Sequence, residues 1–97
     1  MWTPQNPSHP GEILKFYLEE LAISQSALAE KLGCKPPKIN EICTGKRGIT
    51  AEMAIQIADA LGTTPQLWMN AQMNWDLAQA MKKAGKKPAD YYKSKAG

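Results

Sequence analysis

With 97 residues, the chain is long enough for one domain with a single modest core. Its apolar and charged fractions, 43% and 22%, are ordinary for a globular protein, and no apolar run is long enough to span a membrane. The N-terminus has neither the basic region nor the apolar core of a signal peptide, so we expect a cytoplasmic protein.

The net charge of +3 is unevenly distributed along the chain. Residues 1–81 contain six basic and eight acidic groups, whereas residues 82–97 contain six lysines and one acid. Four of the six basic groups in the first part lie between positions 35 and 47. A local basic cluster on an otherwise acidic domain is the pattern expected of a nucleic-acid reader. The lysines at the C-terminus fit a nonspecific nucleic-acid arm or, more simply, a soluble end.

The first predicted elements are an arm and a helix. Residues 1–8 contain two prolines and little pattern, which favours an arm. Pro10 suits the first position of a helix, with His9 as its cap and Glu12 in its first turn. Residues with helical spacing then predict one apolar stripe, made by Ile13, Leu14, Tyr17, Leu18 and Leu21.

Two short helices follow. Ser24 is a good N-cap for a second helix over residues 25–32, which Gly33 would end. A third helix is predicted over residues 36–44, with Gly45 after it.

The spacing across these two helices is that of a DNA-binding helix-turn-helix. Ala29 is small, so two helices can cross closely beside it. Gly33 can adopt a positive φ at little cost, which permits a sharp turn. Ile39 and Ile42 lie three residues apart and would anchor one face of the second motif helix. The exposed face of that helix would then enter the major groove.

Two further helices complete the predicted domain. Thr50 caps a fourth helix over residues 51–61, and Thr64 caps a fifth that Pro65 opens and that can run through Met81. No stretch reads as a strand, so the chain is predicted to be all-α. The predicted organisation is a flexible arm (1–8), a DNA-binding and dimerisation domain (9–81) and a basic flexible tail (82–97).

The fifth helix is predicted to be apolar around most of its circumference, so it must be buried on more than one side. A domain this small covers one face of a terminal helix, and a second copy of the chain most simply covers the other. Trp68 and Trp75 lie seven residues apart and fit a core and an interface about equally. The candidate dimer residues are Leu67, Trp68, Ala71, Trp75 and Ala78.

The start of the third helix carries side chains that can read bases. Lys38 can reach phosphate or guanine, and Asn40 can form two hydrogen bonds with adenine. Glu41 can accept a hydrogen bond from cytosine, although a solvated helix face explains it equally well.

Other candidate contacts are with the DNA backbone. Ser24 and Gln25 lie at a helix N-terminus that can bind phosphate, and Ser24 also serves as a cap. The pair Lys46-Arg47 follows a glycine in a loop and suits the sugar-phosphate backbone. The full set of candidate DNA-binding residues is Ser24, Gln25, Lys35, Pro37, Lys38, Asn40, Glu41, Lys46 and Arg47.

The sequence offers no pattern typical of metal binding or catalysis. Cys34 and Cys43 are interpreted as small, partly buried apolar residues, and the one histidine, His9, is distant from them. There is no serine-base signature, phosphate loop or carboxylate pair that would indicate an enzyme. We therefore expect no cofactor, no metal ion and no catalytic residues.

Several short motifs lie between residues 8 and 80. They include the start His9-Pro10-Gly11-Glu12, the loop Gly45-Lys46-Arg47-Gly48-Ile49-Thr50, the pair Pro65 and Trp68, and the stretches 24–25, 29–33, 53–55, 61–68 and 72–77. Together they resemble the HigA/VapI antitoxins of the XRE, or Cro/repressor-like, group. The combination is far more specific than the helix-turn-helix spacing alone.

This resemblance implies a five-helix, lambda-repressor-like DNA-binding domain in a bacterial or phage protein. It also implies a homodimer that binds a palindromic operator, represses its own operon and associates with the nucleoid when bound. A HigB-type toxin that cleaves mRNA on ribosomes would be the protein partner.

The chain departs from the family pattern at two places. Pro36-Pro37 replaces small polar residues before the recognition helix, which removes two backbone donors. Glu41 occupies a position where a basic or polar reader is common. Two alternatives therefore stay open: an XRE-type regulator without a toxin, and a protein-interaction module that has lost DNA binding.

Overall fold

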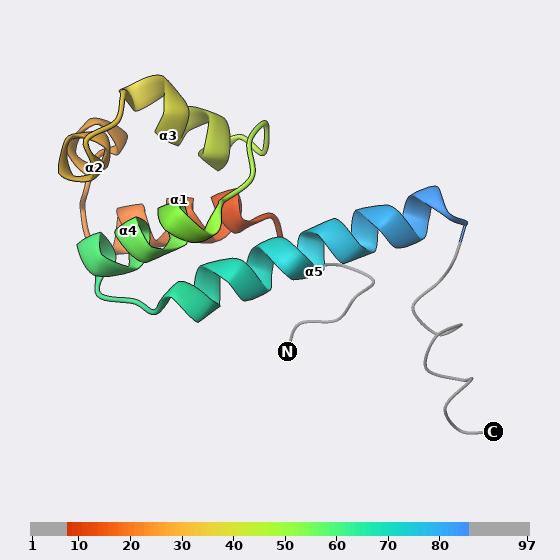
Figure 1. Ribbon diagram of the computed structural model, residues 1–97. Helices are drawn as coiled ribbons and strands as arrows, with labels where there is room; N and C mark the ends of the chain where they lie inside the picture. Colours follow the sequence, from red (N-terminus) through yellow and green to blue (C-terminus); the bar gives the residue numbers. More distant parts are fainter. Residues whose placement is uncertain (1–7, 86–97) are drawn as a thin grey trace.

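The computed structural model describes residues 8–85, which contain five helices and no strand (Figure 1). The helices are α1 (Pro10–Glu20), α2 (Gln25–Leu32), α3 (Pro36–Cys43), α4 (Ala51–Leu61) and α5 (Pro65–Lys83). In Figure 1, α2 and α3 lie above α1 and α4, and α5 runs below them and extends beyond the other helices. The all-α prediction is confirmed, and the predicted helix ends agree to within two residues. Most of the predicted arm and tail, residues 1–7 and 86–97, lie outside the described residues.

Side-chain caps begin four of the five helices. His9 Nδ1 accepts from the Gly11 N–H at 2.9 Å, and Ser24 Oγ accepts from the Ala27 N–H at 3.0 Å. Thr50 and Thr64 cap α4 and α5 in the same way. These bonds satisfy N–H groups that have no partner within the helix.

The start of α3 has no side-chain cap. Its first two positions are Pro36 and Pro37, which have no N–H to satisfy. The double proline therefore removes the need for a cap, and it also removes two donors that another helix could offer to a phosphate.

The turn between α2 and α3 follows from Gly33. This residue has a φ of +71°, in the left-handed region. The Gly33 N–H donates to the Glu30 carbonyl at 3.2 Å, and the Cys34 N–H donates to the Ala29 carbonyl at 2.9 Å. The two bonds form a Schellman motif, which ends α2 and directs the chain into α3. Ala29 is fully buried at the crossing, as its size predicts.

The core lies between all five helices and has Trp68 as its largest fully buried side chain. The indole Nε1–H donates to Thr63 Oγ1 at 2.8 Å, so the one polar atom of the ring is satisfied. The other core side chains are Leu14, Leu18, Leu28, Ala29, Ile39, Ile42, Cys43, Ile49, Met53, Ala54, Ile57, Ala58 and Leu61. The predicted stripe of α1 loses one member, because Leu21 is the C-cap and is 46% exposed.

The structure corrects part of the predicted dimer surface. Trp68 and Ala71 are 0% and 8% exposed, so they pack inside their own protomer, and assigning them to the dimer contact was wrong. Trp75 is half-buried, with its ring edge-to-face against His9 at a centroid distance of 5.1 Å. Leu67 and Ala78 are half-buried and remain candidates.

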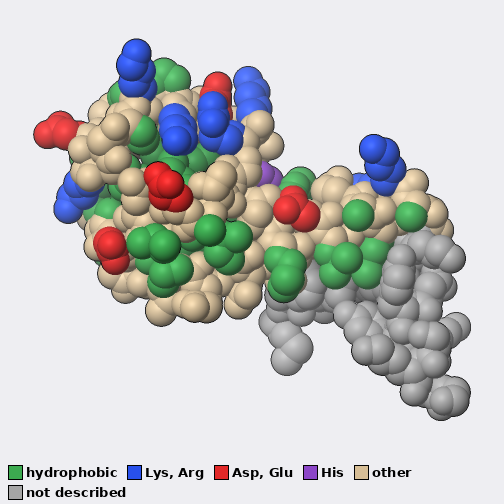
Figure 2. All heavy atoms as spheres, viewed as in Figure 1, with side chains coloured by type: hydrophobic (Ala, Val, Ile, Leu, Met, Phe, Trp, Pro, Cys, Tyr) green, Lys and Arg blue, Asp and Glu red, His purple; other side chains and the backbone are tan. Residues whose placement is uncertain are grey.

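Two large side chains of α5 are instead exposed. Met73 is 59% exposed and Leu77 is 47% exposed, and they lie one helical turn apart. Apolar atoms lie along the lower side of this helix in Figure 2. One apolar face of α5 is therefore buried in the core, and a second apolar face is exposed on the surface.

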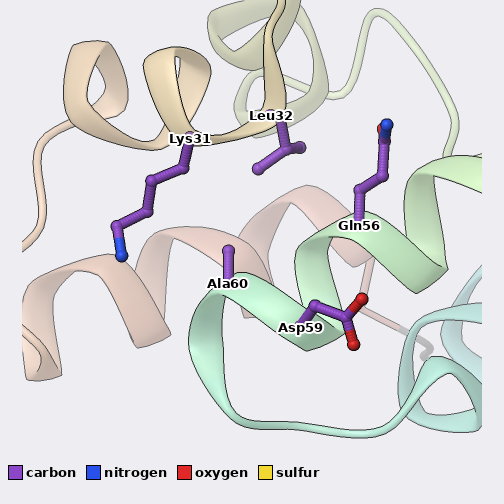
Figure 3. A pocket seen from close by; sticks show the side chains of 5 residues that line it. All are labelled: Lys31, Leu32, Gln56, Asp59 and Ala60. Carbon is purple, nitrogen blue, oxygen red and sulfur yellow. The ribbon is translucent and has the colours of Figure 1, made fainter.

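A hollow of about 330 Å³ lies between α2 and α4 (Figure 3). Its lining includes Lys31 and Asp59, whose side chains point away from each other in the figure. Among residues 8–85 there is no group of three or more metal-ligating side chains. No helix in this range is long and apolar enough to cross a membrane.

Candidate nucleic-acid interface

The recognition helix α3 is anchored by one apolar face. Ile39 and Ile42 are fully buried, and Cys43 is 5% exposed. On the other side, Pro37 and Asn40 are exposed. The helical period that buries the isoleucines thus leaves the predicted reading residue Asn40 free to face a ligand.

The structure joins Asn40 to Gln25. The Asn40 Nδ2 donates to Gln25 Oε1 at 3.3 Å, between α3 and the first residue of α2. Asn40 keeps its Oδ1 and one N–H free, which is the pair of groups that recognises adenine. The bond limits the rotation of the Asn40 amide, so Gln25 sets its orientation.

The Glu41 side chain is paired with Arg47 in the loop between α3 and α4. Its Oε1 accepts from Arg47 Nε at 2.9 Å and lies 2.8 Å from Arg47 Nη2. Both side chains are nearly half exposed, at 43% and 49%, so the pair contributes no more than about 1 kcal/mol. Its main effect is geometric, because it holds a loop cation beside the recognition helix.

The backbone of the loop is also fixed by Glu41. Its carbonyl accepts from the N–H groups of Lys46 and Arg47, at 2.8 and 3.1 Å. Gly45 before them has a φ of +82°, which lets the chain reverse at the end of α3. Lys46 is exposed and has no acidic partner within the described residues.

The cations gather on the side of the molecule formed by α2, α3 and this loop (Figure 2). Lys35 is exposed at the start of α3. Lys38 is half-buried and shares with Arg47 a hollow of about 380 Å³ that lies beside Gln72 and Asp76 of α5.

The predicted contact residues lie on α2, α3 and the loop after α3, and the structure links only some of them. The structure brings together Gln25 with Asn40, and Glu41 with Arg47. Ser24 serves as the α2 cap. The basic residues predicted between positions 35 and 47 therefore lie on α3, at its start and in the loop after it, and Lys38 and Arg47 line one hollow.

One residue of this region, Gln72, was not predicted from the sequence. Gln72 Oε1 accepts from the Ile49 N–H at 2.7 Å, at the end of the loop. No local pattern indicates this contact, because the two residues are 23 positions apart.

Burial favours the neutral forms of two side chains near the site, His9 and Cys43. Burial lowers the pKa of His9 below its ordinary value of 6.5, and Glu12 and Asp76 oppose that shift in part. Burial raises the pKa of the Cys43 thiol, with Lys15 acting in the opposite direction. His9 is therefore a neutral cap and contact for Trp75, and Cys43 is an unreactive core residue.

Known proteins share this arrangement. The model of the helix-turn-helix family matches residues 14–68. Virulence-associated protein I of Dichelobacter nodosus is 44% identical over 73 residues, which cover 74% of this chain and 68% of that protein. Antitoxin HigA-1 of Vibrio cholerae is 40% identical over 76 residues, which cover 77% of this chain and 71% of that protein.

Among solved structures, Pseudomonas aeruginosa antitoxin HigA with the higBA promoter has a TM-score of 0.78 and 43% identity. The match covers 82% of this chain and 88% of that one. Both the sequence and the arrangement of α2 and α3 therefore agree with the same group of proteins. The chain belongs to the XRE-type helix-turn-helix family, within the group of the HigA antitoxins.

Proposed function

We propose that this protein is a sequence-specific DNA-binding repressor and the antitoxin of a type II toxin-antitoxin pair. The observation that carries the proposal is the face of α3, where Gln25 orients the exposed Asn40 and the neighbouring Glu41 holds the loop cation Arg47. The related Pseudomonas HigA was solved with promoter DNA, which supports the same use of this face.

The geometry favours a division of roles. Asn40 and Lys38 read base edges in the major groove, and Gln25 positions Asn40. Lys46 and Arg47 contact phosphates without reading sequence. Glu41 holds Arg47 in place, which explains why an acidic side chain is tolerated here.

Symmetry follows from the exposed part of α5. We propose that the exposed Met73 and Leu77, together with the half-buried Leu67 and Ala78 of the same helix, pack against a second copy of the chain. The two recognition helices then stand about 34 Å apart on one side of a palindromic operator. Light scattering on the wild type and on Leu77→Asp should give a dimer and a monomer. A wild type that stays monomeric at high concentration contradicts this contact.

The antitoxin role concerns a protein partner. Two of the relatives named above are antitoxins, and the proposed partner of this chain is a HigB-type toxin that cleaves mRNA, in the bacterial cytoplasm and without catalysis by this chain. Co-expression with the product of an adjacent small, basic reading frame should restore growth that the toxin alone arrests. An absent neighbour, or growth arrest unchanged by co-expression, indicates a regulator without a toxin.

DNA binding is tested by titrating the protein against its own promoter region over a series of salt concentrations. Asn40→Ala and Lys38→Ala should reduce the preference for promoter over random DNA. Lys46→Ala should weaken both and reduce the salt slope by about one unit, because one phosphate contact is lost.

The matched control is Lys31→Ala, because Lys31 points from α2 towards the hollow beside α4 (Figure 3). It changes the net charge equally but should leave the salt slope unchanged. Wild-type protein that binds promoter and random DNA alike, or not at all, would support the protein-interaction alternative.

A further inference from the structure

The loop between α3 and α4 is held from two directions. Its first half is bonded to the Glu41 carbonyl at the end of α3. Its second half meets α5, where Gln72 Oε1 accepts from the Ile49 N–H at 2.7 Å. The Ile49 side chain is 3% exposed, so it fixes the loop in the core beside this bond. The loop cations Lys46 and Arg47 form the first attachment through their own N–H groups, and the second attachment, at Ile49, lies two residues after Arg47.

The Gln72 amide is itself oriented. Its Nε2 donates to Asp76 Oδ1 at 2.9 Å, one turn along α5. Because the nitrogen is engaged by a carboxylate, the oxygen is directed to the loop. The chain Ile49–Gln72–Asp76 is a small network in which each member restricts the next.

Gly48 shows how closely Gln72 approaches the loop. Its φ is not positive, so its backbone does not require a glycine. A Cβ at this position would lie 2.9 Å from Gln72 Oε1 and 3.1 Å from Cδ and Nε2. The Gln72 amide therefore occupies the space that a side chain at position 48 would take.

We propose that Gln72 is a positioning residue for DNA binding, which fixes the phosphate-contacting loop onto α5 without touching DNA itself. The inference rests on the proposed function of Lys46 and Arg47. Arg47 is next to Gly48 in the chain and lines the same hollow as Gln72 and Asp76. When the bond from Ile49 to Gln72 is lost, the loop cations are held only from the Glu41 side, so DNA binding must order the rest of the loop at a cost in affinity.

The perturbation is Gln72→Met, which keeps the length and volume of the side chain but cannot accept from Ile49. We expect the affinities for promoter and random DNA to fall together, by about 3- to 10-fold, the equivalent of one lost hydrogen bond. The ratio of the two affinities should stay at the wild-type value, because α3 is unchanged. The Ile49 amide should lose its protection from hydrogen exchange, measured by NMR without DNA.

Rescue comes from exchanging the two polar groups. In the double variant Gln72→Glu with Asp76→Asn, a carboxylate oxygen accepts from Ile49 and the other accepts from the new amide at position 76. The net charge and the side-chain lengths of the pair are conserved. Affinity and Ile49 protection should return to within about twofold of the wild type. A residue with a role only in packing would tolerate methionine and would gain nothing from the exchange.

Gln79→Met is the matched control, because Gln79 is exposed on the same helix. It should bind DNA like the wild type. If wild-type protein binds the promoter and Gln72→Met binds it equally, or if the exchange leaves affinity low, the positioning role is overturned. If the wild type itself does not bind DNA but Ile49 protection responds as expected, the attachment of the loop to Gln72 stands and the proposed function fails.

Discussion

The close approach of α1 to α3 makes Gly11→Ala the sharpest perturbation of this fold. A Cβ at Gly11 would overlap the Ile42 carbonyl oxygen and lie 2.8 Å from its carbonyl carbon and 3.0 Å from the Cys43 Cα. These atoms are backbone of the recognition helix, so no side-chain rotation can relieve the contact. Alanine gains about 0.5–1 kcal/mol in a helix, whereas overpacking costs about 1–3 kcal/mol or more.

Because the obstacle is rigid, the cost should lie at the upper end of this range. The expected net loss is about 2 kcal/mol in the free energy of unfolding, or about 10 °C in Tm for a domain of this size. The clash also displaces the end of α3, so we expect weaker promoter binding by protein that is still folded. Thermal unfolding followed by circular dichroism and a DNA titration well below Tm measure the two effects.

Gly62→Ala separates stability from displacement. Gly62 has a φ of +74°, and a Cβ at this position would meet no neighbouring atom within 4 Å. Alanine there costs about 1–2 kcal/mol of backbone strain, but it moves no neighbouring helix. We expect a similar loss of Tm with normal DNA affinity for the folded protein. A Gly11→Ala variant that unfolds at the wild-type temperature, or that binds DNA as Gly62→Ala does, would refute the reasoning.

Three further predictions concern stability. Because burial lowers the pKa of His9, the contribution of the neutral imidazole to the free energy of unfolding is complete above pH 6.5. This contribution decreases as the pH falls from 6.5 towards the folded-state pKa. His9→Asn keeps a cap acceptor, so between about pH 7.5 and about pH 5 it should lose less unfolding free energy than the wild type. Ala22 has a φ of +55°, in the left-handed region, so Ala22→Gly should raise the free energy of unfolding in urea by up to about 1 kcal/mol. A destabilised variant would contradict the left-handed conformation of Ala22. Trp68→Phe loses the bond to Thr63 and part of the core volume, so it should cost about 1–3 kcal/mol; Trp75→Phe, at a half-buried ring, is the comparison and should cost less.

The family, the helices and the outward face of α3 were predictable because their signals are local. Caps such as Ser24 and Thr50 bond N–H groups three residues away, and Gly33 ends α2 through its own φ. The 3.6-residue period places Ile39 and Ile42 inward and Asn40 outward without reference to the rest of the chain. Each of these features depends on residues within one or two helical turns.

Partners distant in sequence were decided only by tertiary packing. The hydrophobic pattern of α5 could not show that Trp68 faces the core while Met73 and Leu77 face outward, because apolar residues lie all around this helix. Which side of α5 faces the core depends on how the helix packs against α4 and α1. The sequence contained Gln72 but no sign of its use, since its contact with Ile49 spans 23 residues and exists only once α5 lies beside the loop. Local spacing thus determined which helices form, whereas the packing of α5 decided which side chains fix the loop and which remain free for a partner.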